Sequence, residues 1–209
     1  MQRAFLRITQ ATTFISGPIF VGLALTAHQW VPLLLGEKWN EAIPLIVVLC
    51  LMWVTSFTRI FVSPYLRALG HPRALLLPGL CASACTIAVV FLTAGHAPIY
   101  IMLAWSCRVL ITYPLGLLLL RKYAGIGVGR QLRPLAMPAF CVATMSACVL
   151  GLQSAMAGHG WTLMTELLAS MAVGAISYAA IVLFMHRHRL PAMLADWRGG
   201  SGGMGMKAR

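Results

Sequence analysis

Six apolar stretches, each of about 20 residues, follow one another along the chain and are separated by short polar connections. An α-helix rises about 1.5 Å per residue, so each stretch is long enough to cross about 30 Å of hydrocarbon. Water-soluble domains do not repeat apolar segments of this length, and a composition of 60% hydrophobic and 10% charged residues is far from theirs. We therefore predict an all-α polytopic membrane bundle of about six transmembrane helices, at residues 12–34, 43–62, 74–94, 97–120, 134–153 and 163–185.

The connections between the predicted spans alternate in charge. Thirteen of the 16 Lys and Arg residues lie in the N-terminal segment, the second and fourth connections and the C-terminal tail, whereas the other three connections hold only Lys38. Short loops that carry positive charge stay on the cytoplasmic side. The pattern predicts two cytoplasmic termini, a membrane region at 1–190 and a flexible, glycine-rich cytoplasmic tail at 191–209.

A net charge of +12 is also typical of proteins that bind nucleic acid. Here, however, the basic residues border apolar spans and lack the interleaved aromatic side chains on which single strands stack. Retention in the cytoplasm and attraction to anionic lipid headgroups explain the charge. We therefore expect membrane lipids as partners and no nucleic acid.

The chain offers few groups for catalysis or metal binding. It carries no phosphate-cradling glycine loop and no nucleophile elbow, and its acidic residues are only Glu37, Glu41, Glu166 and Asp196. The six cysteines lie in or at the edges of apolar spans, where an unpaired cysteine behaves as a small hydrophobe. We expect no enzymatic activity, no metal site and no cofactor.

Two arginines lie inside predicted spans, where a cation is costly unless it faces a cavity or a partner. Arg108 lies ten residues past Pro98, about 15 Å along a helix and therefore close to the midplane. Its helical neighbours are Trp105 and Thr112, so one face carries an aromatic ring, a cation and a hydroxyl. Because an arginine fork suits phosphate, we predict that Arg108, Trp105 and Thr112 bind an anionic substrate; a structural bond to a backbone carbonyl is the alternative.

Arg59 is the second intramembrane arginine, and it lies three residues from the predicted cytoplasmic end of its span. From there its side chain can extend to the lipid headgroups, or it can line one polar cavity together with Arg108. The sequence leaves both interpretations open. We include Arg59 as the fourth candidate substrate-binding residue.

Small residues recur at helical spacing in the fifth and sixth spans. Ala139, Ala143 and Ala147 form one stripe, and Ser170 lies four residues before Gly174. Such stripes are typical of closely packed membrane helices. We predict helix contacts, and no binding site, on these faces.

The first two spans and their connections carry recognisable motifs: SGPIFVGLALTA (16–27), VPLLLGEKWNEAIPLIVVL (31–49) and SPYLRALGHPR (63–73). They resemble the carboxy-terminal portion of polysaccharide flippases of the multidrug/oligosaccharidyl-lipid/polysaccharide (MOP) superfamily, above all bacterial lipopolysaccharide and exopolysaccharide exporters. In that family a Pro-Ile/Leu-x-x-Gly-Leu helix precedes a Leu-Gly-x-x-Trp-x-x-Ala external turn and, one helix later, a Leu-x-Ala-Gly-type cytoplasmic turn. The matching residues are Pro18, Gly22, Leu23, Leu35, Gly36, Trp39 and Ala42 and, more loosely, Leu66, Ala68 and Gly70.

This resemblance implies a transporter that flips or exports a lipid-linked oligosaccharide, of the undecaprenyl-pyrophosphate type, across the bacterial inner membrane for envelope polysaccharide biosynthesis. Such flippases resemble two lobes of six helices, so six spans imply a part of the protein that lacks the amino-terminal lobe. Two alternatives stay open: a multidrug-type exporter of the same superfamily, and a non-transporting scaffold that binds a polysaccharide polymerase or glycosyltransferases. The lack of a membrane-buried carboxylate for ion coupling disfavours the multidrug alternative.

Overall fold

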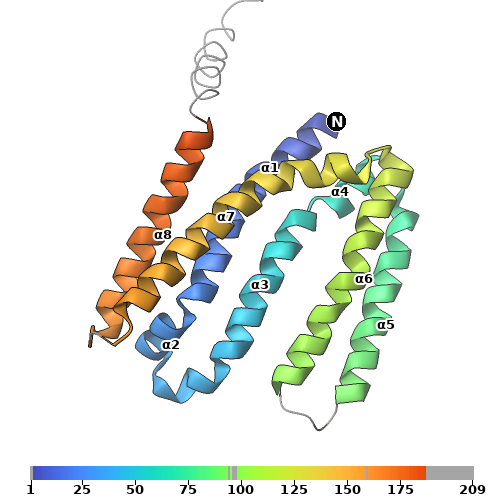
Figure 1. Ribbon diagram of the computed structural model, residues 1–209. Coiled ribbons are helices and arrows are strands. Elements are labelled where there is room, and N and C mark those ends of the chain that lie inside the picture. Colours follow the sequence, from blue (N-terminus) through green and yellow to red (C-terminus); the bar gives the residue numbers. More distant parts are fainter. Residues whose placement is uncertain (1, 94, 96–97, 159, 187–209) are drawn as a thin grey trace, which may run out of the picture.

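The computed structural model describes residues 2–93, 95, 98–158 and 160–186 of the 209-residue chain. Long α-helices dominate these ranges, and no strand occurs in them (Figure 1). Six helices are long and apolar enough to cross a membrane, which confirms the predicted all-α multi-pass bundle. The long helices are α1 (Gln2–Leu25), α3 (Ile43–Arg59), α5 (Leu76–Thr93), α6 (Pro98–Ala124), α7 (Val128–Met156) and α8 (Leu163–His186). The predicted tail at 191–209 lies outside the described residues.

The first predicted span differs most from its helix. The sequence predicted residues 12–34, whereas α1 ends at Leu25 and a short helix, α2 (Ala27–Leu35), follows a break at Thr26. Helix α1 also begins well before residue 12, because its polar first turns are helical although they lie outside the apolar stretch. The other five predicted spans agree with their helices to within six residues at each end.

Side chains stabilise the break between α1 and α2. Trp30 Nε1 donates a hydrogen bond to the Leu23 carbonyl at 3.0 Å, and Gln153 Nε2 of α7 donates to the Leu25 carbonyl at 3.1 Å. Carbonyls at the end of a helix have no partner within it, so side-chain donors that satisfy them lower the cost of ending the helix inside a membrane. The break is therefore held by α2 and α7 together.

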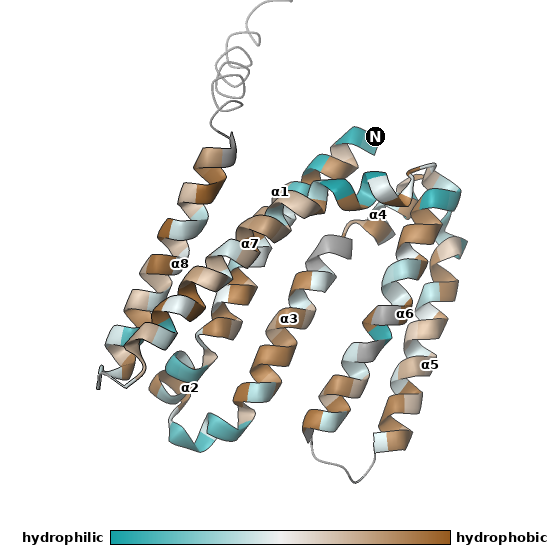
Figure 2. Ribbon diagram, in the orientation of Figure 1, coloured by the Kyte–Doolittle hydropathy of each residue, from teal (hydrophilic) through white to brown (hydrophobic). Residues whose placement is uncertain are grey.

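The connections alternate between two ends of the bundle (Figure 1). One end holds the start of α1, the α6–α7 connection, and the α3–α5 connection with helix α4 (Val62–Ala68) and the 3-10 helix η2 (Pro72–Leu75). We call it the basic end, because the arginines and lysines of these segments make it hydrophilic (Figure 2). The opposite end holds α2, the 3-10 helix η1 (Glu37–Ala42), and the α5–α6 and α7–α8 connections. The charge alternation in the sequence therefore coincides with the two ends of the structure.

Helices α1 and α7 lie at the centre of the packing. Helix α1 packs against α3 and α7, and α7 also packs against α8. Helix α5 packs mainly against α6 and has no buried residue. The largest cluster of buried apolar side chains lies at the basic end, where Phe5 of α1 meets Leu66 of α4, Leu119 and Leu120 of α6, and Ile126 of the α6–α7 connection.

Two glycines mark close contacts with α7. A Cβ atom at Gly17 of α1 would lie 3.0 Å from Cγ2 of Val142, and a Cβ atom at Gly174 of α8 would lie 3.3 Å from Cγ2 of Val149. Glycine allows membrane helices to approach this closely. The helix contact predicted at Gly174 is therefore confirmed.

The alanine stripe of α7 does not make the helix contact that the sequence predicted for it. Ala139, Ala143 and Ala147 are exposed, whereas Cys141 and Met145, on another face of the same helix, are buried. The predicted contact of this stripe is wrong within the described chain, because spacing identifies a helical face but not the side on which a neighbour packs.

Candidate functional site

Arg108 lies on α6, ten residues from the start of that helix at Pro98, or about 15 Å along its axis. The helix begins with a proline, which suits a first turn because proline lacks the N–H that would have no partner there. Helix α6 continues to Ala124 at the basic end, so Arg108 lies within the apolar part of the span. That this position is close to the midplane of a membrane stays a prediction.

The guanidinium of Arg108 lies over the indole ring of Trp105, with Cζ 3.9 Å from the ring centroid. One of its nitrogens, Nη1, donates to the hydroxyl of Thr86 on α5 at 3.5 Å, which is a long hydrogen bond. Both arginine and tryptophan are half-buried. A cation on an aromatic face is stabilised by up to about 2 kcal/mol where water is excluded. Trp105 therefore orients the guanidinium and offsets part of the cost of its place in the membrane.

The other predicted residues lie on the same helix or on its neighbour. Thr112 is buried one turn beyond Arg108. Helix α3, which ends at Arg59, packs against α6, but the side chain of Arg59 lies outside the described part of the structure. The structure thus brings Trp105 and Arg108 together, and a shared polar cavity with Arg59 stays a prediction.

Helix α6 presents separate polar contacts to its two neighbours. The hydroxyl of Ser106 lies 2.7 Å from the Met102 carbonyl oxygen and 2.9 Å from the sulfur of Met52 on α3. Arg108 contacts Thr86 on α5 instead. Arg108 therefore contacts α5, whereas Ser106 contacts α3.

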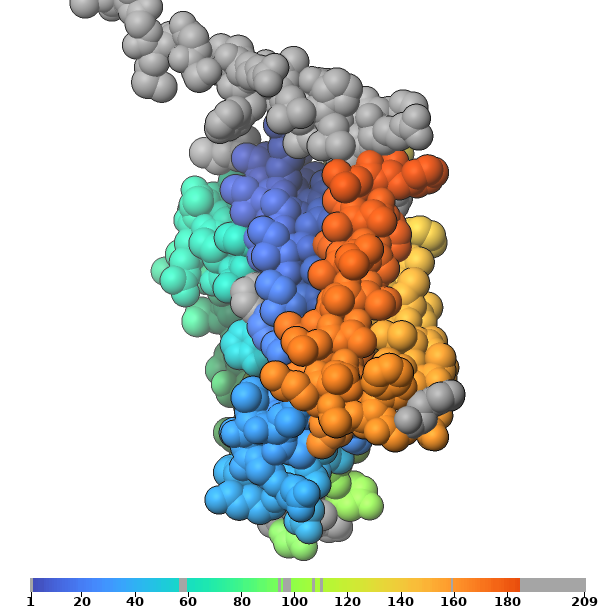
Figure 3. Space-filling view, turned by 90° about the vertical axis from the view of Figure 1, so that its left-hand side faces the viewer, coloured from blue at the N-terminus to red at the C-terminus, as the bar shows by residue number. Residues whose placement is uncertain are grey.

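An apolar groove of about 620 Å³ lies between α1 and α2 on one side and α7 and α8 on the other. Figure 3 shows this face of the molecule, with α8 in orange beside α1 and α2 in blue. The Tyr178 hydroxyl, which lines it, donates to the Phe14 carbonyl of α1 at 2.6 Å. Sequence reasoning missed the groove, because its walls come from four helices far apart in the chain. Its lining includes Pro18, Gly22, Thr26, Trp30, Ser170 and Gly174.

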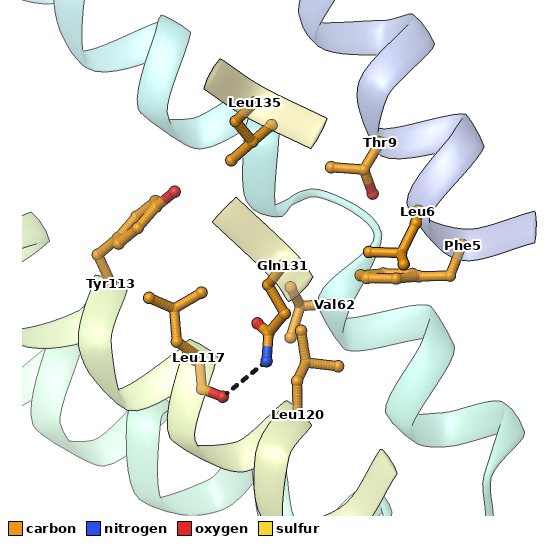
Figure 4. Close-up of a pocket in the computed structure, with 10 residues that line it drawn as sticks. Phe5, Leu6, Thr9, Val62, Tyr113, Leu117, Leu120, Gln131 and Leu135 are labelled. Atoms are coloured by element: carbon orange, nitrogen blue, oxygen red, sulfur yellow. Dashed lines mark hydrogen bonds between the residues drawn. The ribbon is translucent and has the colours of Figure 1, made fainter. Parts of the chain in front are cut away.

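A second, much smaller cavity of about 30 Å³ lies at the basic end between α1, α4, α6 and α7 (Figure 4). Gln131 of α7 reaches into this region, where its side-chain nitrogen donates to the carbonyls of Leu117 and Ile126. This role of Gln131 was not predicted, because the residue lies among basic residues just before a predicted span. Arg108 lines neither of these two cavities.

Among the described residues, no group of three or more His, Cys, Asp and Glu side chains is placed to hold a metal ion. Three of the four acidic residues lie at the opposite end, in η1 and in the first turn of α8; the fourth, Asp196, lies outside the described ranges. The chemistry that the site around Arg108 offers is therefore that of a cation with rigid hydrogen-bond donors in apolar surroundings.

Six spanning helices and a strong charge difference between their ends define a multi-pass α-helical membrane protein. Residues 1–44 match a family described as "Polysaccharide biosynthesis protein". The chain is also 32% identical over 73 residues to the lipopolysaccharide biosynthesis protein WzxC of Escherichia coli (strain K12). That alignment covers 35% of this chain and only 13% of WzxC.

Both findings confirm the resemblance that the motifs of the first two spans indicated, for a part of the chain. No solved structure matches the chain significantly. The matched part spans a small fraction of the relative's length.

Proposed function

We propose that this chain is part of a membrane transporter that flips or exports a lipid-linked oligosaccharide or polysaccharide precursor across the inner membrane. The observation that carries the proposal is the guanidinium of Arg108, held in the apolar part of α6 by Trp105. Its neighbours along the helix and on α5 supply an indole ring and a hydroxyl, but no carboxylate. A cation without a counter-charge favours an anionic ligand. The similarity to polysaccharide biosynthesis proteins supports the same conclusion.

The pyrophosphate of an undecaprenyl-linked sugar fits this arrangement chemically. A guanidinium presents paired donors that match two phosphate oxygens, and its charge acts more strongly in apolar surroundings than in water. Trp105 limits the directions that the guanidinium can adopt, and the Thr112 hydroxyl, one turn further along, is the next polar group on the helix. Arg59 would contact the same anion nearer the basic end.

The membrane orientation follows from the charge at the two ends. With the basic end in the cytoplasm, Arg108 lies between the side on which precursors are made and the side on which they are released. Anionic lipid headgroups would contact the basic end. The partners we propose beyond the lipid-linked substrate are a polysaccharide polymerase or glycosyltransferases.

Binding of undecaprenyl pyrophosphate to the whole chain in lipid nanodiscs tests this proposal, with undecaprenol as the uncharged comparison. We expect wild-type protein to prefer the pyrophosphate, and Arg108→Gln to lose at least about tenfold in affinity, because a charged hydrogen bond contributes about 1.5–3 kcal/mol. Arg108→Lys should be intermediate, since it keeps the charge without the fork. Arg121→Gln changes an exposed arginine on the same helix and is the matched control.

The possible outcomes test the proposed ligand and the proposed binding residue separately. Equal binding of undecaprenyl pyrophosphate and undecaprenol by wild-type protein would contradict the proposed ligand. A preference for the pyrophosphate that survives in Arg108→Gln but disappears in Arg121→Gln would support the ligand and contradict the assignment of Arg108. A multidrug-type exporter would bind neither compound selectively.

A further inference from the structure

The apolar groove between α1 and α2 on one side and α7 and α8 on the other runs lengthwise along α8 (Figure 3). Its lining on α8 begins at Leu167, near the opposite end of the bundle, and ends at Tyr178, so the groove is about 16 Å long. The hydrocarbon core of a membrane is about 30 Å thick, so one leaflet contributes about 15 Å. The length of the groove therefore matches the depth of the leaflet at the opposite end.

The groove is too narrow for a whole helix. A volume of about 620 Å³ over about 16 Å gives a mean cross-section of about 40 Å², or a width of about 7 Å. An α-helix with its side chains is about 10–12 Å across. An extended hydrocarbon chain is much thinner than a helix. The dimensions of the groove therefore favour a lipid chain over another transmembrane segment.

The walls of the groove offer hydrocarbon rather than polar atoms to an occupant. The polar side chains in its lining are Thr26, Trp30, Ser170 and Tyr178. Thr26, Trp30 and Tyr178 donate to backbone carbonyls of α1 at 2.6–3.0 Å, and Ser170 is only 1% exposed. The hydrogen bond of Tyr178 joins two walls of the groove, α8 and α1, at its inner end. An occupant that enters from the opposite end therefore meets apolar walls as far as this bond.

A carboxylate lies at the outer end of the groove. Glu166 is in the first turn of α8, one residue before Leu167 and four before Ser170, both of which line the groove. Residues four apart share a helical face, so Glu166 lies on the grooved face of α8. It is half-buried, and none of the described residues forms an ion pair with its carboxylate. This position favours a partner that combines a cation with a hydrocarbon chain.

We propose that the groove and Glu166 bind one molecule of phosphatidylethanolamine from the leaflet at the opposite end. One acyl chain fills the groove as far as Tyr178, and the ammonium group of the lipid donates to the Glu166 carboxylate. Such an ammonium has three N–H donors, as in lysine. Phosphatidylcholine has no N–H in its headgroup, and the net negative charge of phosphatidylglycerol is repelled by the carboxylate. The site is independent of the proposed transport function, because Arg108 does not line the groove.

Native mass spectrometry of the whole chain, released from nanodiscs, tests the proposal. The nanodiscs contain equal amounts of phosphatidylethanolamine, phosphatidylcholine and phosphatidylglycerol, which differ in mass. We expect wild-type protein to retain one lipid, with phosphatidylethanolamine enriched at least about tenfold over each of the others, as one charged hydrogen bond can produce. Retention of no lipid, or of all three equally, would overturn the proposal.

Glu166→Gln tests the headgroup contact, because it removes the charge at nearly constant size. We expect this variant to retain a lipid but to lose the enrichment of phosphatidylethanolamine over the other two. Glu41→Gln is the matched control, since Glu41 is an exposed carboxylate at the same end in η1 and does not line the groove. An enrichment that persists in Glu166→Gln would overturn the assigned contact.

Gly22→Leu tests the groove itself. Gly22 lines it, and a Cβ atom there meets nothing within 4 Å, so a leucine side chain can extend into the groove. We expect lipid retention to fall several-fold. Gly151→Leu is the control, because Gly151 is exposed on α7 with equally open space but lies outside the groove. Unchanged retention in Gly22→Leu would overturn the groove as the site. A lipid-free wild-type dimer that becomes monomeric in Gly22→Leu would identify a second copy as the occupant and overturn the lipid.

Discussion

Polar groups are accommodated in opposite ways at the basic end and in the α5–α6 pair. At the basic end, the buried amide of Gln131 bonds two backbone carbonyls inside a cluster of apolar side chains drawn from several elements. In the α5–α6 pair, Arg108 lies half-buried on Trp105, and its neighbour α5 has no buried residue at all. The first arrangement closes a joint between helices, whereas the second leaves a charge at the edge of the bundle.

This difference distinguishes a polar group that folding explains from a charge that folding does not fully explain. A polar group that satisfies the backbone is explained by folding, since unpaired carbonyls are costly in a membrane. A cation that has, among the described residues, an aromatic ring and one long hydrogen bond as its contacts is incompletely explained by folding. If the two regions differ in this way, substitutions at the basic end should mainly change stability, and substitutions around Arg108 should mainly change ligand binding.

Gln131→Leu should destabilise the protein most, by about 2–4 kcal/mol, because it leaves the carbonyl of the buried Ile126 without this donor and removes the second bond to the half-buried Leu117 carbonyl. Thermal unfolding in detergent measures the effect. Gln2→Leu is the control, since Gln2 also donates to a carbonyl at the end of α6, that of Ala124, but is exposed. Equal losses in the two variants would mean that the basic end is no better packed than the surface.

Gly17→Ala should lower stability by about 1–3 kcal/mol, because a methyl group 3.0 Å from Cγ2 of Val142 forces α1 and α7 apart. The control is Gly22→Ala on the same helix, where a Cβ atom meets nothing within 4 Å. This control should be neutral or stabilising, since alanine favours a helix over glycine. The same unfolding measurement decides, and a loss in Gly22→Ala equal to that in Gly17→Ala would contradict a tight α1–α7 contact.

Trp105→Leu should weaken binding of undecaprenyl pyrophosphate several-fold, by about 1 kcal/mol, because the guanidinium of Arg108 loses the ring that orients it. Trp105→Phe should recover part of the loss. Trp161→Leu is the control, because Trp161 is exposed and lies in the α7–α8 connection. Binding in nanodiscs measures all three variants. A Trp105→Leu variant that binds like wild type would show that the ring matters only for folding.

The features that depend on a single helix could be predicted from the sequence, whereas those that depend on contacts between helices could not. Apolar length predicted six helices, charge predicted two distinct ends, and a spacing of three placed Trp105 beside Arg108, because each depends on the period of a single helix. Contacts between helices could not be predicted in this way. The burial of Gln131, the exposure of the alanine stripe of α7 and the apolar groove all depend on which faces meet.

The break at Thr26 shows the same limit within one predicted span. Its apolar pattern continues without interruption, and the carbonyls that end α1 are satisfied by Trp30 from the next turn and by Gln153 from α7, more than a hundred residues away. A break of this kind leaves no mark in hydropathy, since both sides of it are apolar.

The smallest expected effect concerns Thr86. Its hydroxyl bonds the Ala82 carbonyl of its own helix at 2.8 Å and accepts from Arg108 at 3.5 Å, near the limit of a hydrogen bond. Thr93 of the same helix makes the first kind of bond, to Val89, without an arginine. Thr86→Val and Thr93→Val should therefore differ by less than about 0.5 kcal/mol in thermal unfolding. A much larger loss in Thr86→Val would mean that Thr86 anchors the arginine, and the structural explanation of Arg108 would then replace the proposed binding role.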